Sequence, residues 1–146
     1  MRCPMASETS FQQEFAIEGG DFNNAGRASS RLRNILKQIG ISPLVIRRVS
    51  TASYEAEMNV VLYARRGTLS FMVTPEKITI VVEDEGQGIA DIGLAMQEGY
   101  STASREIREM GFGAGMGLPN IKKNADELEI SSEVGLGTTV RFSVKI

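Results

Sequence analysis

A carboxylate and an amide four residues apart are the first sign of chemistry in this 146-residue chain. Glu55 and Asn59 would share one face of a helix, because side chains four residues apart stack. Such a carboxylate can take a proton from an attacking hydroxyl, and an amide oxygen is a ligand that Mg²⁺ accepts. Arg48, seven residues before Glu55, lies near the same stripe. The alternative is a solvated polar face, and Glu57 is expected to face solvent.

A second segment joins an acidic residue to a glycine turn. Asp84 follows the apolar run 78–82, and Gly86 and Gly88 allow a tight turn and a close approach of the backbone to a ligand. A buried carboxylate at a strand end can accept a hydrogen bond from an exocyclic amine such as that of adenine. The alternative is an ordinary acidic turn.

The third segment is a glycine cluster before a helix expected to begin near Leu118. Glycines at a helix N-terminus expose backbone N–H groups to an anion. The pattern lacks the Gly-Lys-Ser/Thr of a P-loop and the preceding strand of a dinucleotide fold, and a flexible hinge is the alternative. The cluster comprises Gly111, Gly113, Gly115 and Gly117.

The stretch 99–113 has no clean periodicity and is expected to be a mobile loop. Ordering it costs about 1–2 kcal/mol per residue in backbone entropy, so we expect it to close only around a ligand. Either Arg105 or Arg108 could reach a γ-phosphate, and charged residues on a solvated loop are the alternative. Its other polar side chains are Ser101, Thr102 and Ser104.

Composition excludes several classes of protein. With 16 basic and 18 acidic residues the net charge is −2, which argues against a nucleic-acid surface. No apolar run is long enough to span a membrane. Cys3 is the only cysteine, which excludes an internal disulfide and favours the reducing cytoplasm. The chain has no histidine, so imidazole is absent from any mechanism.

One domain over residues 1–146 is expected to position these segments. A strand over 11–18 precedes a helix from an Asp21 N-cap to about Ile39. Ser42-Pro43 predicts the start of a second helix, which runs to about Ala64 with Gly67 ending it. Leu44 and Tyr63 are expected on its core face, beside Val45, Val49, Ala52, Ala56 and Val60.

The rest of the chain predicts two hairpins and one helix. The runs 69–73 and 78–82 form the first hairpin, a helix covers 118 to about 128, and 128–131 pairs with 140–144. This order predicts an α+β fold: a two-layer sandwich with a mixed, mostly antiparallel β-sheet and helices packed on one face.

The order and spacing of these segments resemble the GHKL ATPase superfamily, which includes gyrase and histidine kinases and has the Bergerat ATP-binding fold. The resemblance implies ATP and Mg²⁺ as ligands, with Asn59 on the metal, Asp84 on adenine, and Leu118 and the loop residues near the phosphates. Thr139 would support the adenine pocket. The matching residues are Glu55 and Asn59, then Asp84, Gly86 and Gly88, then Gly113, Gly115 and Gly117, and finally Gly137, Thr138 and Thr139.

Within the superfamily the chain looks like the small bacterial anti-sigma serine kinases of the RsbT-type stressosome switch, through residues 59–67, 83–92 and 96–102. That group implies transfer of the ATP γ-phosphate to a serine or threonine of a STAS-domain partner. Glu55 would be the base, and Arg48 the basic residue seven positions earlier. Residues 105–110 are inserted relative to the shortest members, so the choice between Arg105 and Arg108 stays open.

Further partners implied by this group are a sigma factor or a PP2C-type phosphatase, and a homodimer is compatible with the first strand and helix. Two alternatives to the kinase remain. One is a non-catalytic, ATP-gated binding module that sequesters a sigma factor or activates a phosphatase. The other is the ATPase domain of a histidine kinase.

Overall fold

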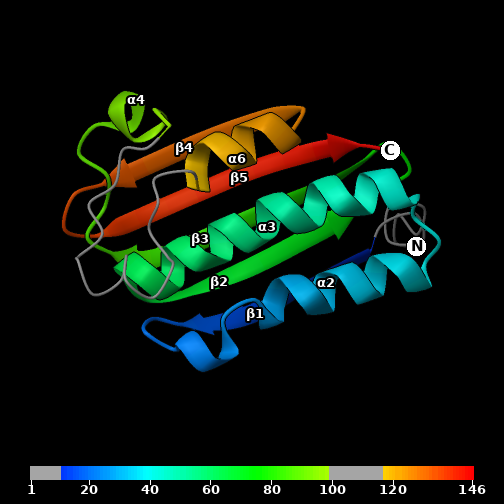
Figure 1. The fold of residues 1–146 in the computed structure, drawn as a ribbon, viewed down its shortest axis with the longest axis horizontal. Coiled ribbons are helices and arrows are strands. Elements are labelled where there is room, and N and C mark those ends of the chain that lie inside the picture. The colour runs from blue at the N-terminus through cyan, green and yellow to red at the C-terminus, as the bar shows by residue number, and fades with distance from the viewer. Residues whose placement is uncertain (1–10, 99–116) are drawn as a thin grey trace, which may run out of the picture.

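A five-stranded antiparallel sheet, covered on one face by helices, organises the computed structural model, which describes residues 11–98 and 117–146 (Figure 1). The strand order is β1-β2-β3-β5-β4. All four strand pairs of the described residues are antiparallel. The predicted α+β class is confirmed, and the described sheet is wholly antiparallel rather than mixed. The strands are β1 (Phe11–Glu18), β2 (Ala64–Val73), β3 (Lys77–Gly86), β4 (Glu127–Glu133) and β5 (Gly137–Lys145).

The longest helix crosses the middle of the sheet between two shorter ones (Figure 1). It packs on β1, β2, β3 and β5, whereas α2 covers β1 and α6 covers β4. No helix within residues 11–98 and 117–146 is long and apolar enough to cross a membrane. The helical elements are η1 (Phe22–Asn24), α2 (Arg27–Gln38), α3 (Pro43–Tyr63), α4 (Ile92–Ala95) and α6 (Gly117–Asn124).

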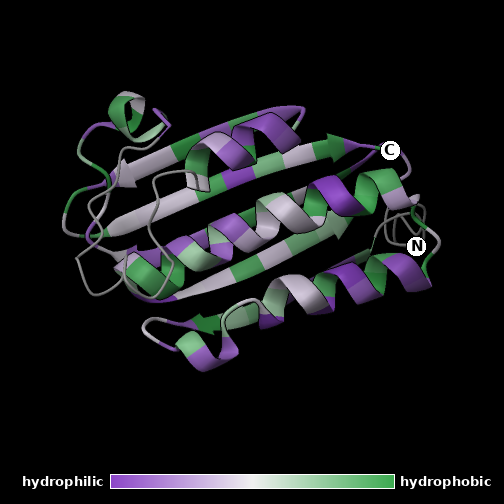
Figure 2. Cartoon of the chain, viewed as in Figure 1, coloured by the Kyte–Doolittle hydropathy of each residue, from purple (hydrophilic) through white to green (hydrophobic). Residues whose placement is uncertain are grey.

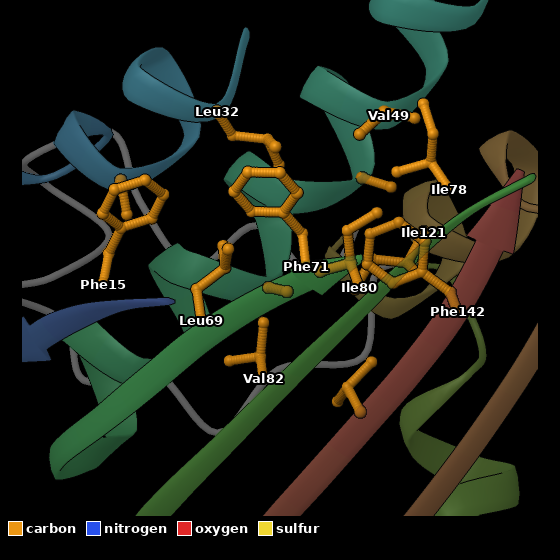
Figure 3. Packing of buried hydrophobic residues seen from close by; sticks show 14 of the residues in the cluster. Phe15, Leu32, Val49, Leu69, Phe71, Ile78, Ile80, Val82, Ile121 and Phe142 are labelled. Carbon is orange, nitrogen blue, oxygen red and sulfur yellow. The ribbon is translucent and has the colours of Figure 1, made fainter. Parts of the chain in front are cut away.

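One apolar core fills the space between the helices and the sheet (Figure 3). Buried residues recur along the central strands, mostly at every second position. Hydrophilic and apolar residues alternate along α2 and α6, as expected of helices that cover a core on one side (Figure 2). Burial of each large apolar side chain contributes about 1.5–3 kcal/mol to the stability of the fold. Because the core is closely packed, α3 is held in a fixed position on the sheet. Among the fully buried side chains are Leu32, Val49, Leu69, Ile80, Ile121 and Phe142.

The start of α2 differs from the prediction. Asp21 does not cap this helix, because a short 3₁₀ turn follows it and its carboxylate accepts a hydrogen bond from the Asn24 amide at 2.8 Å. The helix begins only at Arg27, after Gly26 with a φ of 92°. Gly26 offers no side-chain cap, so the acceptor for the first N–H groups must come from elsewhere.

That acceptor is Glu57 of α3, which is buried with 2% exposure rather than facing solvent as expected. Its carboxylate accepts hydrogen bonds from the backbone N–H groups of Gly26 at 3.0 Å, Ala28 at 3.2 Å and Ser29 at 2.9 Å. A carboxylate is favoured there because the helix N-terminus carries partial positive charge. Glu57 therefore joins α2 to the helix that carries Glu55 and Asn59.

Other element boundaries follow local signals with a few exceptions. Ser42 caps α3 as predicted, accepting from Val45 N at 3.5 Å, but Leu44 is 63% exposed rather than in the core. Gly67 does not end α3, because β2 begins at Ala64 and Gly67 lies within it, against Val60. Helix α6 ends at Asn124 rather than near residue 128, because β4 takes over at Glu127.

Replacing Glu57 by alanine should destabilise the fold by about 2–4 kcal/mol, because three buried N–H groups lose their acceptor. Urea unfolding followed by circular dichroism measures the change. Glu129→Ala is the matched control, since Glu129 lies on an exposed side of β4, and it should stay within about 0.5 kcal/mol of the wild type. A Glu57→Ala protein as stable as this control would contradict the capping role.

Candidate nucleotide-binding site

The half-buried side chains of Glu55 and Asn59 lie one turn apart on α3. Asn120 of α6 donates a hydrogen bond from its amide nitrogen to Glu55 Oε2 at 3.2 Å. Burial raises the pKa of Glu55 above its ordinary value, and the Asn120 hydrogen bond opposes this rise. A carboxylate with a raised pKa is a better proton acceptor, which suits Glu55 to general-base chemistry.

Asn59 faces the first residue of α6. A Cβ built on Gly117 would lie 3.2 Å from Asn59 Oδ1, so a side chain there would crowd the amide and glycine leaves it room. In residues 11–98 and 117–146 no group of three Asp, Glu, Cys or His side chains could hold a metal ion. The oxygen of an amide such as that of Asn59 is a ligand type that Mg²⁺ accepts, alongside water and phosphate oxygens.

Asp84 lies near the end of β3, on the helix-covered side of the sheet with Val82. Its Oδ1 atom accepts a hydrogen bond from Thr138 N at 3.0 Å. Burial raises the pKa of Asp84, while hydrogen bonds from the backbone of Thr138 and Gly86 lower it. A half-buried carboxylate fixed by main-chain donors can accept a further hydrogen bond from a ligand amine.

Two glycines let the Asp-x-Gly-x-Gly turn pack against the β4–β5 hairpin. Gly88 has a φ of 78°, and a Cβ there would lie 2.5 Å from the carbonyl oxygen of Glu133. Gly137 has a φ of 150°, and a Cβ there would overlap the carbonyl oxygen of Asp84. Ser132 Oγ accepts a hydrogen bond from Ile89 N at 2.6 Å and completes the junction. The backbones of the turn and of the hairpin therefore lie in close contact next to Asp84, and side chains at Gly88 or Gly137 would prevent this contact.

Thr139, expected to support the adenine pocket, is not brought to Asp84. The register pairs Thr139 with Glu83, and alternation along β3 and β5 places both on the sheet face opposite to Asp84. Thr138 lies beside Asp84 instead: its N–H donates to Asp84, and its hydroxyl lies 2.9 Å from that of Ser132, while the adenine role of Thr139 stays a prediction. Because Thr138 shares its face with the buried Val140, strand alternation could have identified it from the sequence.

Arg48 contacts Asp126, at the junction of α6 and β4, with its guanidinium 3.2 Å from Oδ1. Seven residues of helix separate it from Glu55 by about 10 Å along the axis. The backbone N–H of Lys145 and then Arg48 lower the pKa of Asp126 by hydrogen bonding to its carboxylate. The catalytic role of Arg48 stays a prediction, and the contact that the structure shows joins α3 to Asp126.

The described residues contain only part of the predicted phosphate-binding segment. Gly117 is the first residue of α6, and the next residue, Leu118, is buried in the core. Asn120 was missed, because its partner Glu55 is 65 residues away in sequence and no local pattern pairs them. The predicted ligand contacts of Ser101, Thr102, Arg105, Arg108, Gly113 and Gly115 lie outside the described residues.

Residues 21–144 match the family of histidine kinase-like ATPase domains. The chain belongs to this family. It is 33% identical to the serine/threonine-protein kinase RsbT of Bacillus subtilis over 113 residues, which are 75% of this chain and 79% of that protein. It is 38% identical to the anti-sigma F factor of Caldanaerobacter subterraneus over 100 residues, 65% of this chain and 66% of that protein. The predicted resemblance to GHKL ATPases and anti-sigma kinases is confirmed.

Solved structures share the fold at low sequence identity. The SiaB–SiaC complex from Pseudomonas aeruginosa matches with a TM-score of 0.65 and 15% identity, over 97% of this chain and 93% of the other. A Mycobacterium tuberculosis protein with RsbU and RsbW domains matches with a TM-score of 0.59 and 18% identity, over 90% of this chain and 32% of the other. These matches confirm the two-layer α+β architecture.

Asp84→Asn should weaken ATP binding about 10- to 100-fold, because a hydrogen bond to an ionised acceptor contributes about 1.5–3 kcal/mol. The asparagine keeps an oxygen for Thr138 N but turns an NH₂ group towards the adenine amine. Isothermal titration calorimetry with Mg²⁺-ATP measures the change. Glu83→Gln is the control on the opposite face of β3 and should bind as the wild type does. Unchanged affinity in Asp84→Asn would contradict the adenine assignment.

Glu55→Gln should raise stability at pH 7 relative to the wild type, with the gain vanishing below about pH 4. Burial raises the pKa of Glu55 in the folded state above its value in the unfolded state. The wild type is therefore more stable when Glu55 is protonated, and it loses this stability as pH rises through the folded-state pKa. Glutamine carries no charge to bury and still accepts from Asn120. Urea unfolding at both pH values tests this, and an equal difference at both would contradict it.

Proposed function

We propose that this chain is an ATP-dependent protein serine/threonine kinase that acts as a partner-switching regulator of the anti-sigma type. The observation that carries the proposal is the arrangement on α3: Glu55, held by Asn120, lies one turn from Asn59, which faces the start of α6. A general base and a hard amide oxygen on one helical stripe suit the transfer of a phosphoryl group to a hydroxyl.

Each part of the site has one task in this proposal. Asp84 accepts a hydrogen bond from the adenine amine, and the backbone around Gly86, Gly88 and Gly137 admits the ring. Asn59 would hold Mg²⁺, which neutralises charge on the phosphates when bound. Glu55 takes the proton of the attacking serine or threonine hydroxyl. Most of the rate enhancement comes from positioning, as in phosphoryl transfer generally.

The phosphate-binding part of the proposal is carried by the segment before α6. The residues proposed to contact phosphates are Ser101, Thr102, Arg105 or Arg108, Gly113 and Gly115, together with Gly117 and Leu118. Two of these, Gly117 and Leu118, begin α6, where backbone N–H groups at a helix N-terminus favour an anion. Arginine suits the γ-phosphate because its guanidinium offers paired donors.

We infer a STAS-domain protein as the phosphate acceptor, and a sigma factor or a PP2C-type phosphatase as the second partner. Support comes from relatives named as a serine/threonine-protein kinase and an anti-sigma F factor, and from a fold neighbour solved in complex with a second protein. The chain acts in the cytoplasm in this proposal, consistent with its single cysteine.

Glu55→Ala should keep ATP binding and lower phosphate transfer about 10²- to 10⁴-fold, the range expected for the loss of a general base. The assay uses Mg²⁺ and γ-labelled ATP with a STAS-domain protein from the same genome. Glu129→Ala, a remote acidic residue of β4, is the control. Unchanged transfer in Glu55→Ala would rule out its role as the base.

The same assay distinguishes the kinase from a non-catalytic binding module. Label on a serine or threonine of the STAS protein supports the kinase. A tight complex that forms with ATP but yields no phosphoprotein would instead favour an ATP-gated binding protein, with the fold and the adenine site unchanged.

A further inference from the structure

Asn120 joins α6 directly to Glu55. Its side-chain Nδ2 lies 3.2 Å from Glu55 Oε2. An ionised carboxylate only accepts hydrogen bonds, so the amide must present its NH₂ group to Glu55. Both side chains are half-buried, and a hydrogen bond to an ionised group is stronger when it is partly shielded from water.

Helix α6 is held firmly enough to position this amide. Leu118 and Ile121, on either side of Asn120, are buried in the core. One turn later, Asn124 Nδ2 donates to the backbone carbonyl of Asn120 at 2.8 Å. The first residue of the same helix, Gly117, lies against Asn59. A single short helix therefore contacts both Glu55 and Asn59.

We propose that Asn120 is a positioning residue for phosphoryl transfer, which holds one oxygen of Glu55 so that the other faces the substrate hydroxyl. The inference rests on the proposed kinase function. It also makes the orientation of the base depend on the seating of α6, the helix that follows the glycine-rich segment. A base held in one rotamer is aligned for proton transfer without the cost of ordering it at each turnover.

Neighbouring charges do not replace this contact within the described residues. On α6, Lys122 is exposed and Lys123 pairs with Glu98 at 2.7 Å. On α3, Arg48 pairs with Asp126, and the Glu57 carboxylate is turned to α2. In the part of the chain that the structure describes, no ion pair reaches Glu55, and its one side-chain partner is Asn120.

The first test needs no protein partner. The pKa of Glu55 is measured by ¹³C NMR of its side-chain carboxyl, assigned with Glu55→Gln, in the wild type and in Asn120→Ala. The pKa should rise in Asn120→Ala, because the lost hydrogen bond favoured the charged form. Asn120→Asp keeps the shape but cannot donate when ionised, and should raise the pKa further. The control Asn34→Ala, at an exposed asparagine of α2, should leave it unchanged.

The second test measures catalysis with Mg²⁺-ATP and the STAS-domain acceptor. In Asn120→Ala, kcat should fall about 10- to 100-fold while the KM for ATP stays within about twofold, and the low-pH limb of the rate profile should move to higher pH. A merely structural role would lower the folded fraction or the ATP affinity and leave this limb in place.

The two measurements separate the possible failures. An unchanged Glu55 pKa or an unchanged kcat in Asn120→Ala, with an active wild type, overturns the role of Asn120 alone. A wild type that binds ATP but phosphorylates no acceptor overturns the proposed function, and the positioning role with it, even if the NMR titration shows the coupling.

Discussion

The packing of α3 across the centre of the sheet is the constraint on which the rest of this structure depends. Its inner face, formed by residues such as Val49, Ala52 and Val60, is wholly excluded from water. Close-packed interiors resist the movement of a single element, so the helix has one position relative to β2 and β3. The side chains on its flanks are therefore aimed in fixed directions before any ligand arrives.

The two flanks carry acidic residues with different environments. On one side Glu57 is buried and satisfied by three N–H groups at the start of α2. On the other side Glu55 is only half-buried, is held by the one amide of Asn120, and has its pKa raised by burial. The buried carboxylate with three backbone donors stabilises the fold, whereas the half-buried one has a single side-chain partner among the described residues.

The surroundings of Asp84 are formed by backbone rather than by side chains. Asp84 stands where two hairpins meet, and its position is set by the N–H of Thr138 and the absence of a side chain at Gly137. Strands β3 and β5 are hydrogen-bonded neighbours although residues 87–136 lie between them in the chain. This pairing brings the Asp-x-Gly-x-Gly turn and the Gly-Thr-Thr segment side by side.

Local patterns in the sequence predicted most of the elements, and the order of its motifs indicated the family. Hydrophobic periodicity, the Ser42-Pro43 cap and the two hairpins predicted most helices and strands, because these signals act over a few residues. The tertiary structure alone decided the surroundings of each element. It buried Glu57 beneath α2 and joined Arg48 to Asp126 and Asn120 to Glu55. Each of these contacts joins residues far apart in the chain, and no local spacing specifies which distant backbone or amide will meet a given carboxylate.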